Sequence, residues 1–267
     1  MSGAVIEVED LVASYDGNIV LDGITFEVRA REVFVVLGGS GCGKSTLLRH
    51  LLGLHKPTSG RIRVFGTDIT AVSEEELQPI RQRIGMVFQG AALFNSMTLA
   101  ENVSLPLEEY TDYPARVIQD IVDWKLQLVE LGHAREYLPA QLSGGMKKRA
   151  AIARAMVMDP DLLFFDEHTT GLDPVMAAEL DRTILRLREQ LEITVVVVTH
   201  DMTSIRRIAD RGIMIADGRI VASGTIREME QSSDARVVNF FMRHEEGARP
   251  RGVAGAAAAT GRSSHGY

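Results

Sequence analysis

The chain has a single cysteine, Cys42, among its 267 residues, and it has no long apolar run. One cysteine excludes an internal disulfide and favours a reducing compartment. No apolar run approaches the ~20 residues that a membrane-spanning helix needs, so we expect any work at a membrane to depend on another subunit. The opening residues, MSGAVIE, lack a basic stretch followed by an apolar core, so no secretory signal is expected.

Basic residues are also fewer than acidic ones. The chain has 29 Lys and Arg against 36 Asp and Glu, which gives a formal net charge of −7. A broad nucleic-acid-binding face needs an excess of basic residues, so nucleic acid is not an expected partner. The hydrophobic content of 45% and the charged content of 24% are ordinary for a globular protein of one or two domains with a sizeable core.

Residues 38–46, GGSGCGKST, fit the phosphate-loop pattern G-x-x-x-x-G-K-[ST]. They follow the apolar run VFVVL and precede LLRHLL, so the expected context of strand, loop and helix is present. Glycines at 38, 39, 41 and 43 allow positive φ and let backbone N–H groups approach phosphate oxygens, while the helix N-terminus adds its positive dipole end. We expect nucleoside triphosphate binding by Gly38, Gly39, Ser40, Gly41, Cys42, Gly43, Lys44, Ser45 and Thr46. Lys44 is expected on the β- and γ-phosphates, and Ser45 as a Mg²⁺ ligand.

Two further strands are expected to end beside this loop. Residues 161–167, DLLFFDE, form an apolar strand closed by two carboxylates, as in a parallel sheet covered on both faces. At its carboxyl end, Asp166 would bind Mg²⁺ and Glu167 would orient or deprotonate a water molecule. A helix N-cap is the structural alternative for these acids. His200 follows the apolar strand at 193–199, where it is either a polar cap or a contact of the γ-phosphate.

The rest of the chain predicts an α/β fold with a mainly parallel sheet, an antiparallel β flank and an inserted helical subdomain. Residues 4–28 read as short strands around a turn at Asp16-Gly17, and strand alternation returns at 61–65. Residues 84–88 read as a buried strand. From about 90 to about 160 the pattern is helical, with Trp124 on its apolar face. Tyr15 is either a packing residue or an adenine-stacking one, and Gln89 is a solvent-exposed strand end when taken in isolation.

A second helix start that can bind an anion follows Leu142. The sequence Ser143-Gly144-Gly145 opens a helix and leaves N–H groups free for a phosphate. The basic residues 147–149 behind it are interpreted as a solvated helix face. A terminal helix is expected at 234–246, and the Gly-, Ala-, Ser- and Arg-rich residues 247–267 are expected to be disordered.

At this point the sequence resembles the ATP-binding subunit of ABC transporters. The resemblance rests on six motifs in order and spans residues 4 to about 230: the phosphate loop, Gln89, LSGG at 142–145, FDE at 165–167, GLD at 171–173, and His200. It implies a phosphate-loop NTPase fold of the ABC type, with an ABC ATPase domain over residues 1–246. It also implies ATP hydrolysis coupled to transport.

The resemblance further implies that ATP lies between two copies of the chain arranged head-to-tail. Binding would close this dimer and hydrolysis would reopen it, with Ser143, Gly144 and Gly145 of one copy facing the γ-phosphate held by the other. Tyr15 becomes the adenine-stacking aromatic, and Gln89 a contact of Mg²⁺ and water coupled to the membrane subunit. His200 becomes the γ-phosphate sensor, and Asp173 a link across the dimer.

A finer resemblance is to the Mla-type ATPases that serve MCE lipid transporters. It rests on GSGCG at 39–43, FQGAALF at 88–94 and LSGGMKKR at 142–149. It implies an ATPase at the cytoplasmic face of the inner membrane, held there by integral permease subunits. Further implied partners are an MCE lipid-binding ring and a small regulatory subunit, and the implied cargo is phospholipid moved between inner and outer membranes. His168 departs from this family, which usually has proline there; the change removes a rigid φ and adds a titratable group.

The main alternative is the ATPase of an ABC importer for a polar solute such as an amino acid. An ATPase of this kind does not touch the cargo, so its own residues indicate cargo only through family likeness. A GTPase needs an Asn-Lys-x-Asp guanine reader, and the chain has no Asn-Lys pair. ABC proteins of translation usually carry two cassettes, and chromosome-type ones a long coiled coil; neither feature is present.

Overall fold

The computed structural model describes residues 3–248, and it describes side chains as far as residue 242. Most of the tail that we expected to be disordered, residues 249–267, lies outside this part of the chain. Residues 247 and 248 belong to the last helix, α9 (Ala235–Ala248). The terminal helix is therefore present, and it runs two residues further than the sequence predicted.

A six-stranded sheet forms the centre of the molecule, in the order β10-β9-β3-β8-β7-β6. Neighbouring strands are parallel except for β10, which pairs antiparallel with β9. The strands are β3 (Val33–Gly38), β6 (Ile84–Val87), β7 (Leu162–Asp166), β8 (Thr194–Val198), β9 (Arg211–Ala216) and β10 (Arg219–Gly224). Strands β3 and β8 are buried along their whole length, as a parallel sheet covered on both faces requires. The predicted α/β class with a mainly parallel sheet is confirmed.

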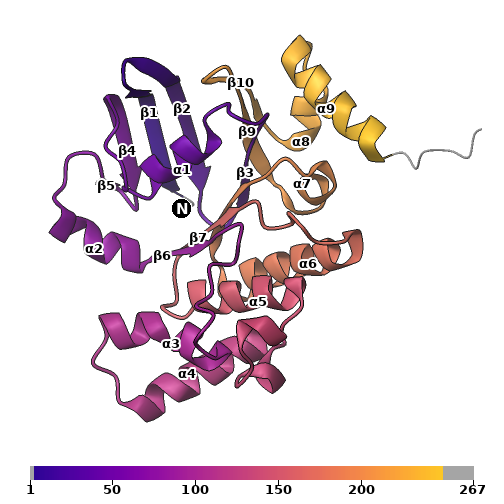
Figure 1. Cartoon of the computed structure of the whole chain (residues 1–267). Helices are drawn as coiled ribbons and strands as arrows, with labels where there is room; N and C mark the ends of the chain where they lie inside the picture. The colour runs from indigo at the N-terminus through magenta and orange to yellow at the C-terminus, as the bar shows by residue number, and fades with distance from the viewer. Residues whose placement is uncertain (1–2, 249–267) are drawn as a thin grey trace, which may run out of the picture.

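A second, antiparallel sheet lies beside the first, in the order β2-β1-β4-β5 (Figure 1). Its strands are β1 (Ala4–Tyr15), β2 (Asn18–Arg29), β4 (Ser59–Val64) and β5 (Thr67–Asp68). The turn between β1 and β2 is Asp16-Gly17, and both residues have positive φ. Helix α1 (Lys44–Leu51) contacts strands of both sheets. The predicted antiparallel flank is therefore present, and its first two strands are long rather than short.

The helical insertion lies between β6 and β7, which are parallel neighbours in the sheet. It contains α3 (Leu99–Tyr110), α4 (Ala115–Leu128) and α5 (Gly144–Ala155), and it forms the lower part of the molecule in Figure 1. Helix α2 (Glu74–Gln82) precedes it, and both α2 and α3 begin with a capping box, at Ser73 and Thr98. The prediction of a helical insertion between two strands of the parallel sheet is thus confirmed.

Two details of the expected packing are wrong. Trp124 is 45% exposed, whereas Leu126, on the same helix, is fully buried. Strand β6 lies at the edge of the sheet and is buried only at alternate residues, so it is not the fully buried strand that we expected. An edge strand has a neighbour on one side only, which leaves its other side open.

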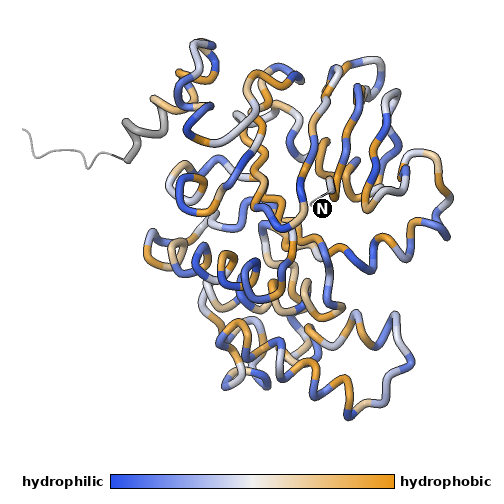
Figure 2. Tube along the Cα trace, turned by 180° about the vertical axis from the view of Figure 1, so that it is seen from behind, coloured by the Kyte–Doolittle hydropathy of each residue, from blue (hydrophilic) through white to orange (hydrophobic). Residues whose placement is uncertain are grey.

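The remaining helices follow the last strands of the sheet. They are α6 (Pro174–Leu191), α7 (Met202–Ile208), α8 (Ile226–Glu230) and α9. Figure 2 shows mostly apolar strands at the centre and helices that alternate between apolar and polar residues. None of the helices in the described part of the chain has the length and apolar character needed to cross a membrane.

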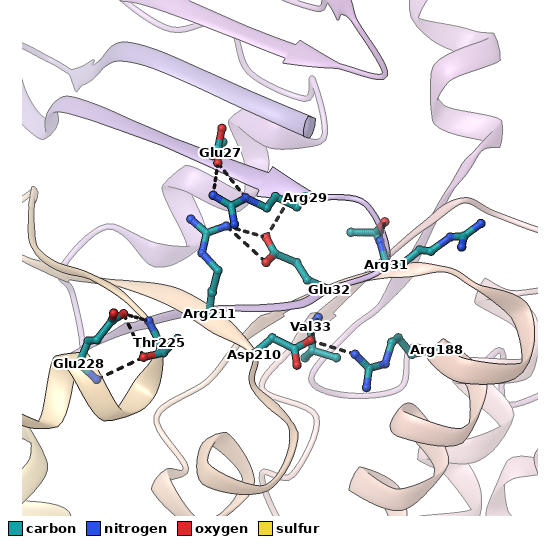
Figure 3. A network of polar contacts seen from close by, with 11 residues as sticks. Glu27, Arg29, Arg31, Glu32, Val33, Arg188, Asp210, Arg211, Thr225 and Glu228 are labelled. Carbon is teal, nitrogen blue, oxygen red and sulfur yellow. Dashed lines mark hydrogen bonds and ion pairs between the residues drawn. The ribbon is translucent and has the colours of Figure 1, made fainter. Parts of the chain in front are cut away.

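A network of charged side chains fixes the amino end of β3 (Figure 3). Glu32 accepts a hydrogen bond from the backbone N–H of Arg29 at 2.7 Å and pairs with Arg211 at 3.3 Å. Asp210 accepts from the backbone N–H of Val33 at 2.8 Å. The same strand delivers the phosphate loop at its other end, so this network fixes the strand from which the loop emerges.

Candidate active site

The loop after β3 adopts backbone conformations that favour glycine. Gly38, Gly41 and Gly43 have φ of 151°, 78° and 107°. A Cβ atom on Gly38 would lie 2.4 Å from the carbonyl oxygen of Ile215, so no side chain fits there. Positive φ is therefore confirmed at these three positions. Gly39 is not among the residues with positive φ, so the expectation of positive φ is wrong there, while the close approach of its N–H to a phosphate stays a prediction.

The side chain of Lys44 is hydrogen-bonded to this loop. Its Nζ donates hydrogen bonds to the carbonyl oxygens of Gly38 at 2.9 Å and of Gly39 at 2.7 Å. Helix α1 begins at Lys44, and its N-cap, Gly43, supplies no side-chain cap. The first N–H groups of a helix have no partner within the helix, so this terminus can bind an anion.

A pocket of about 590 Å³ opens over the loop. It is lined by Gly38, Gly39, Ser40, Gly41, Lys44, Ser45, Asp166, Glu167, Val198, His200, Met214, Ala216, Arg236, Asn239 and Phe240. The ends of β3, β7 and β8 thus bring together the lysine, the two carboxylates and the histidine that the sequence singled out. Such a volume suits a small-molecule ligand, and the edge of the sheet is where open α/β folds bind theirs.

Glu167 and His200 are in direct contact. The Nδ1 atom of His200 lies 3.1 Å from Oε1 of Glu167, and the hydroxyl of Thr170 donates to Oε2 at 3.1 Å. Glu167 has a φ of 47°, a left-handed conformation that is uncommon outside glycine. Its backbone N–H donates to the carbonyl oxygen of Val198 at 2.8 Å, which ties the end of β7 to β8. The carboxylate is therefore held on both of its oxygens.

Burial, reinforced by the neighbouring negative charge of Glu167, raises the pKa of Asp166, while Lys44 and Lys148 act in the opposite direction. A buried carboxylate loses hydration, and this disfavours its charged form. Cations close to Asp166 therefore stabilise its ionised state.

Lys148 corrects our interpretation of the basic run 147–149. Its side chain is only 5% exposed, and its Nζ donates to the backbone carbonyl oxygen of Gln89. Burial lowers the pKa of Lys148, while Asp166 and Glu167 act to raise it. The run is therefore not a solvated face at this residue: Lys148 connects α5 to the segment that carries Gln89.

The remaining predicted residues lie elsewhere among the described residues. Tyr15 is partly exposed, and its hydroxyl is 2.9 Å from Nδ1 of His55. Ser143 and Asp173 are exposed helix caps: Ser143 accepts from the N–H of Met146 at 3.2 Å, and Asp173 from two N–H groups of α6. The residues absent from the lining of the pocket are Tyr15, Gln89, Ser143, Gly144, Gly145 and Asp173, together with Cys42, Gly43 and Thr46 of the loop itself.

Sequence reasoning missed the contribution of α9. Arg236, Asn239 and Phe240 line the pocket, although they lie beyond residues 4 to about 230, over which the sequence resembles ABC transporter ATPases. The sequence predicted a terminal helix here but could not show which part of the structure the helix contacts. Cys42 lines an adjoining hollow with Ile19 and Val20.

Comparison with known proteins agrees with this geometry. The profile of the ABC transporter family matches residues 21–170, which is more than half of the chain. The chain belongs to this family, and it is an ATP-binding subunit that hydrolyses ATP.

Within the family the chain is similar to proteins named MlaF, the intermembrane phospholipid transport system ATP-binding protein. It is 40% identical to MlaF of Haemophilus influenzae over 92% of this chain and 94% of that one. It is 38% identical to MlaF of Escherichia coli K12 over 88% of each. It is also 42% identical to mkl of Mycobacterium leprae, named a probable ribonucleotide transport ATP-binding protein, over 90% of this chain and 69% of that one.

Solved structures share the fold. The structure of cbiO1 of Clostridium perfringens is described as part of the ABC transporter complex cbiONQ. It superposes with a TM-score of 0.79 at 32% identity, over 88% of this chain and 93% of that one. A dimeric post-hydrolysis structure of the ATP-binding cassette MJ0796, bound to ADP and Pi, gives a TM-score of 0.75 at 30% identity and covers 83% of this chain and 99% of its own.

Proposed function

We propose that this ATPase drives a transporter that moves phospholipid between the inner and outer membranes, from the cytoplasmic face of the inner membrane. The observation that supports phospholipid as the cargo is the similarity to the Haemophilus MlaF, which extends over 92% of this chain and 94% of that protein. The similarity to mkl covers only 69% of that protein, although the identity is as high. Transport of a polar solute such as an amino acid or a nucleotide is the competing function.

The active form is a head-to-tail dimer in which each ATP contacts both copies. Ser143 and Gly144, at the N-terminus of α5, are exposed and lie outside the pocket of their own chain. Asp173 is exposed as well, and Leu172, which precedes it, lies close to Gly144: a Cβ on Gly144 would be 3.4 Å from the side chain of Leu172. This surface offers a helix N-terminus to the phosphates held by a second copy, with Gly145 completing the turn.

Within one copy, the loop and Lys44 bind the phosphates. Nζ of Lys44 now bonds to two carbonyl oxygens of the loop, and it exchanges them for the β- and γ-phosphate oxygens. Gly38 to Thr46 supply the backbone N–H groups, and Tyr15 stacks on the adenine. Binding of ATP closes the dimer, and hydrolysis reopens it.

Ser45, Asp166 and Gln89 would hold Mg²⁺ together with the phosphates. The donors are a hydroxyl, a carboxylate and an amide oxygen, which suit this hard cation. Among the described residues, no three His, Cys, Asp or Glu side chains are grouped as a cation site. That agrees with an ion bound through one carboxylate and the phosphates of its substrate. When bound, Mg²⁺ neutralises charge on the transferred phosphoryl group.

Glu167 orients and deprotonates the attacking water, and His200 senses the γ-phosphate. The 3.1 Å contact between His200 and Glu167 places both groups at one side of the pocket. A base must lie within hydrogen-bond reach of the proton that it removes, and the position of Glu167 in the lining of the pocket supports this role. Asp173 contacts the facing copy and reports closure between the two sites.

The membrane partners are integral permease subunits, with an MCE lipid-binding ring and a small regulatory subunit as further partners. These assignments follow the resemblance to the Mla-type ATPases. Gln89 couples the site to the permease, and the bond from Lys148 to its backbone anchors that segment on α5.

The test is to purify the tagged chain from its own cells in mild detergent and to identify the lipid bound to the membrane partners by mass spectrometry. Transfer of a fluorescent phospholipid between proteoliposomes and acceptor vesicles is measured in parallel, with Lys44→Ala as the matched control. We expect bound phospholipid and ATP-dependent transfer that this control abolishes. ATPase activity stimulated by a nucleotide or an amino acid, with no lipid transfer, would refute the cargo assignment and leave the ATPase assignment intact.

A further inference from the structure

The residue after Glu167 is a fully buried histidine. The side chain of His168 has no exposed surface, and its ring contacts Phe165 edge-on at 5.7 Å between centroids. Its Nε2 lies 2.9 Å from Oδ1 of Asp181 and 3.2 Å from the hydroxyl of Ser204. Arg207 pairs with the other carboxylate oxygen of Asp181. We call these four residues the His168 cluster: His168, Asp181, Ser204 and Arg207.

The hydrogen bonds of the cluster show that Nε2 of His168 carries a hydrogen. The hydroxyl of Ser204 donates its one hydrogen to Oδ1 of Asp181 at 2.6 Å. Nε2 of His168 therefore donates to the same oxygen, because a carboxylate only accepts. Nδ1 is buried and has no hydrogen-bond partner among the described residues. His168 is thus oriented through one nitrogen only.

The cluster joins three segments that each carry a residue of the hydrolytic site. His168 directly follows Glu167. Asp181 belongs to α6, whose N-cap is Asp173. Ser204 and Arg207 belong to α7, whose N-cap immediately follows His200. The cluster is therefore placed where it can set the position of Glu167 relative to His200.

We propose that His168 is a positioning residue for hydrolysis, acting through its Nε2 bond to Asp181 and Ser204. Glu167 has a left-handed φ of 47°, which an ordinary residue keeps only when its surroundings impose it. The buried anchor on the next residue supplies that constraint and aligns the 3.1 Å contact between Glu167 and His200. The inference rests on the proposed role of Glu167. Proline at this position would restrict φ covalently, whereas His168 uses hydrogen bonds to α6 and α7.

The test compares His168→Leu, which has no donor, with His168→Gln, whose amide N–H can reach Asp181. A misplacement of reacting groups by ~1 Å costs about a hundredfold in rate. We therefore expect His168→Leu to lower kcat by about ten- to a hundredfold. The KM for ATP should stay near that of the unaltered chain, because Lys44 and the phosphate loop are untouched. His168→Gln should retain most of the kcat of the unaltered chain.

Two further variants make the result specific. Ser204→Ala removes the hydroxyl of the cluster with little change of volume but leaves the Nε2 bond to Asp181. It should show a smaller loss, again confined to kcat, and it keeps the test open if His168→Leu fails to fold. Thr183→Val is the matched control, because Thr183 is buried on α6 and its hydroxyl donates only within that helix, to the carbonyl oxygen of Glu179 at 3.0 Å. It should leave kcat unchanged.

The Glu167→Gln background separates this inference from the assignment of Glu167. If His168 acts through Glu167, then adding His168→Leu to Glu167→Gln should lower kcat no further. Equal losses in His168→Leu and His168→Gln, a loss carried by KM alone, or a matching loss in Thr183→Val would overturn the positioning role. If Glu167→Gln itself hydrolyses ATP normally, the proposed function of Glu167 fails instead.

Discussion

Glu167→Gln is the substitution that tests the hydrolytic site with least disturbance. Glutamine has the shape of glutamate but cannot take up a proton, and the hydroxyl of Thr170 can still donate to its amide oxygen as it does to Oε2 at 3.1 Å. Only proton handling is lost. General base catalysis contributes about 10²- to 10⁴-fold, so kcat should fall by that factor. This corresponds to about 2.7–5.4 kcal/mol in the activation barrier.

Binding of ATP should survive the substitution, because the proposed phosphate contacts come from Lys44 and the loop. The assay is phosphate release under single-turnover conditions, with ATP affinity measured separately by a fluorescent analogue. Thr170→Val is the control: it removes one hydrogen bond to Glu167 but keeps the carboxylate, so it should cost far less in rate. A kcat for Glu167→Gln within about threefold of the unaltered chain would refute the assignment of the base, since such a factor is below 1 kcal/mol.

Three other predictions concern the same site. Ser143→Arg should lower hydrolysis at least about a hundredfold, the usual cost of losing a charge-stabilising donor, yet a single copy should still bind ATP; unchanged turnover would contradict a role for Ser143. Asp166→Asn should abolish hydrolysis and raise the melting temperature of the nucleotide-free protein at neutral pH. The raised pKa of Asp166 means that its stability contribution is complete below 3.8 and is lost as the pH rises through the raised value, so the gain should shrink toward acid pH, and a pH-independent difference would be the adverse result. Cys42 is the only cysteine, so maleimide labelling reports on the loop alone; ATP should slow labelling, and equal rates with and without ATP would place the nucleotide elsewhere.

Short-range patterns predicted the framework of the site well. The phosphate loop needed glycine at residues whose backbone leaves the ordinary regions, and that requirement is visible in the spacing of Gly38, Gly41 and Gly43. The apolar strands that precede Asp166 and His200 could be predicted because a parallel sheet is buried on both faces. Its polar site residues then lie at the carboxyl ends of the strands. The meeting of these residues in one pocket followed from topology alone.

Long-range contacts were not predictable in the same way. Lys148 sits in a basic run, which favours a solvated face. The buried Ala151 and Ile152, three and four residues further along the helix, could have indicated that its face points inward. His168 offered no local signal, because its partners Asp181 and Ser204 lie 13 and 36 residues away. The face that α9 turns to the pocket was hidden for the same reason.

We propose that each ATP is held by two copies of the chain. The most direct measurement is a structure of Glu167→Gln determined with Mg²⁺ and ATP. We predict a head-to-tail dimer in which the γ-phosphate contacts Lys44 of one copy and Ser143 of the other. A triphosphate enclosed by a single copy, with Ser143 of the second copy remote from it, would rule out the shared site.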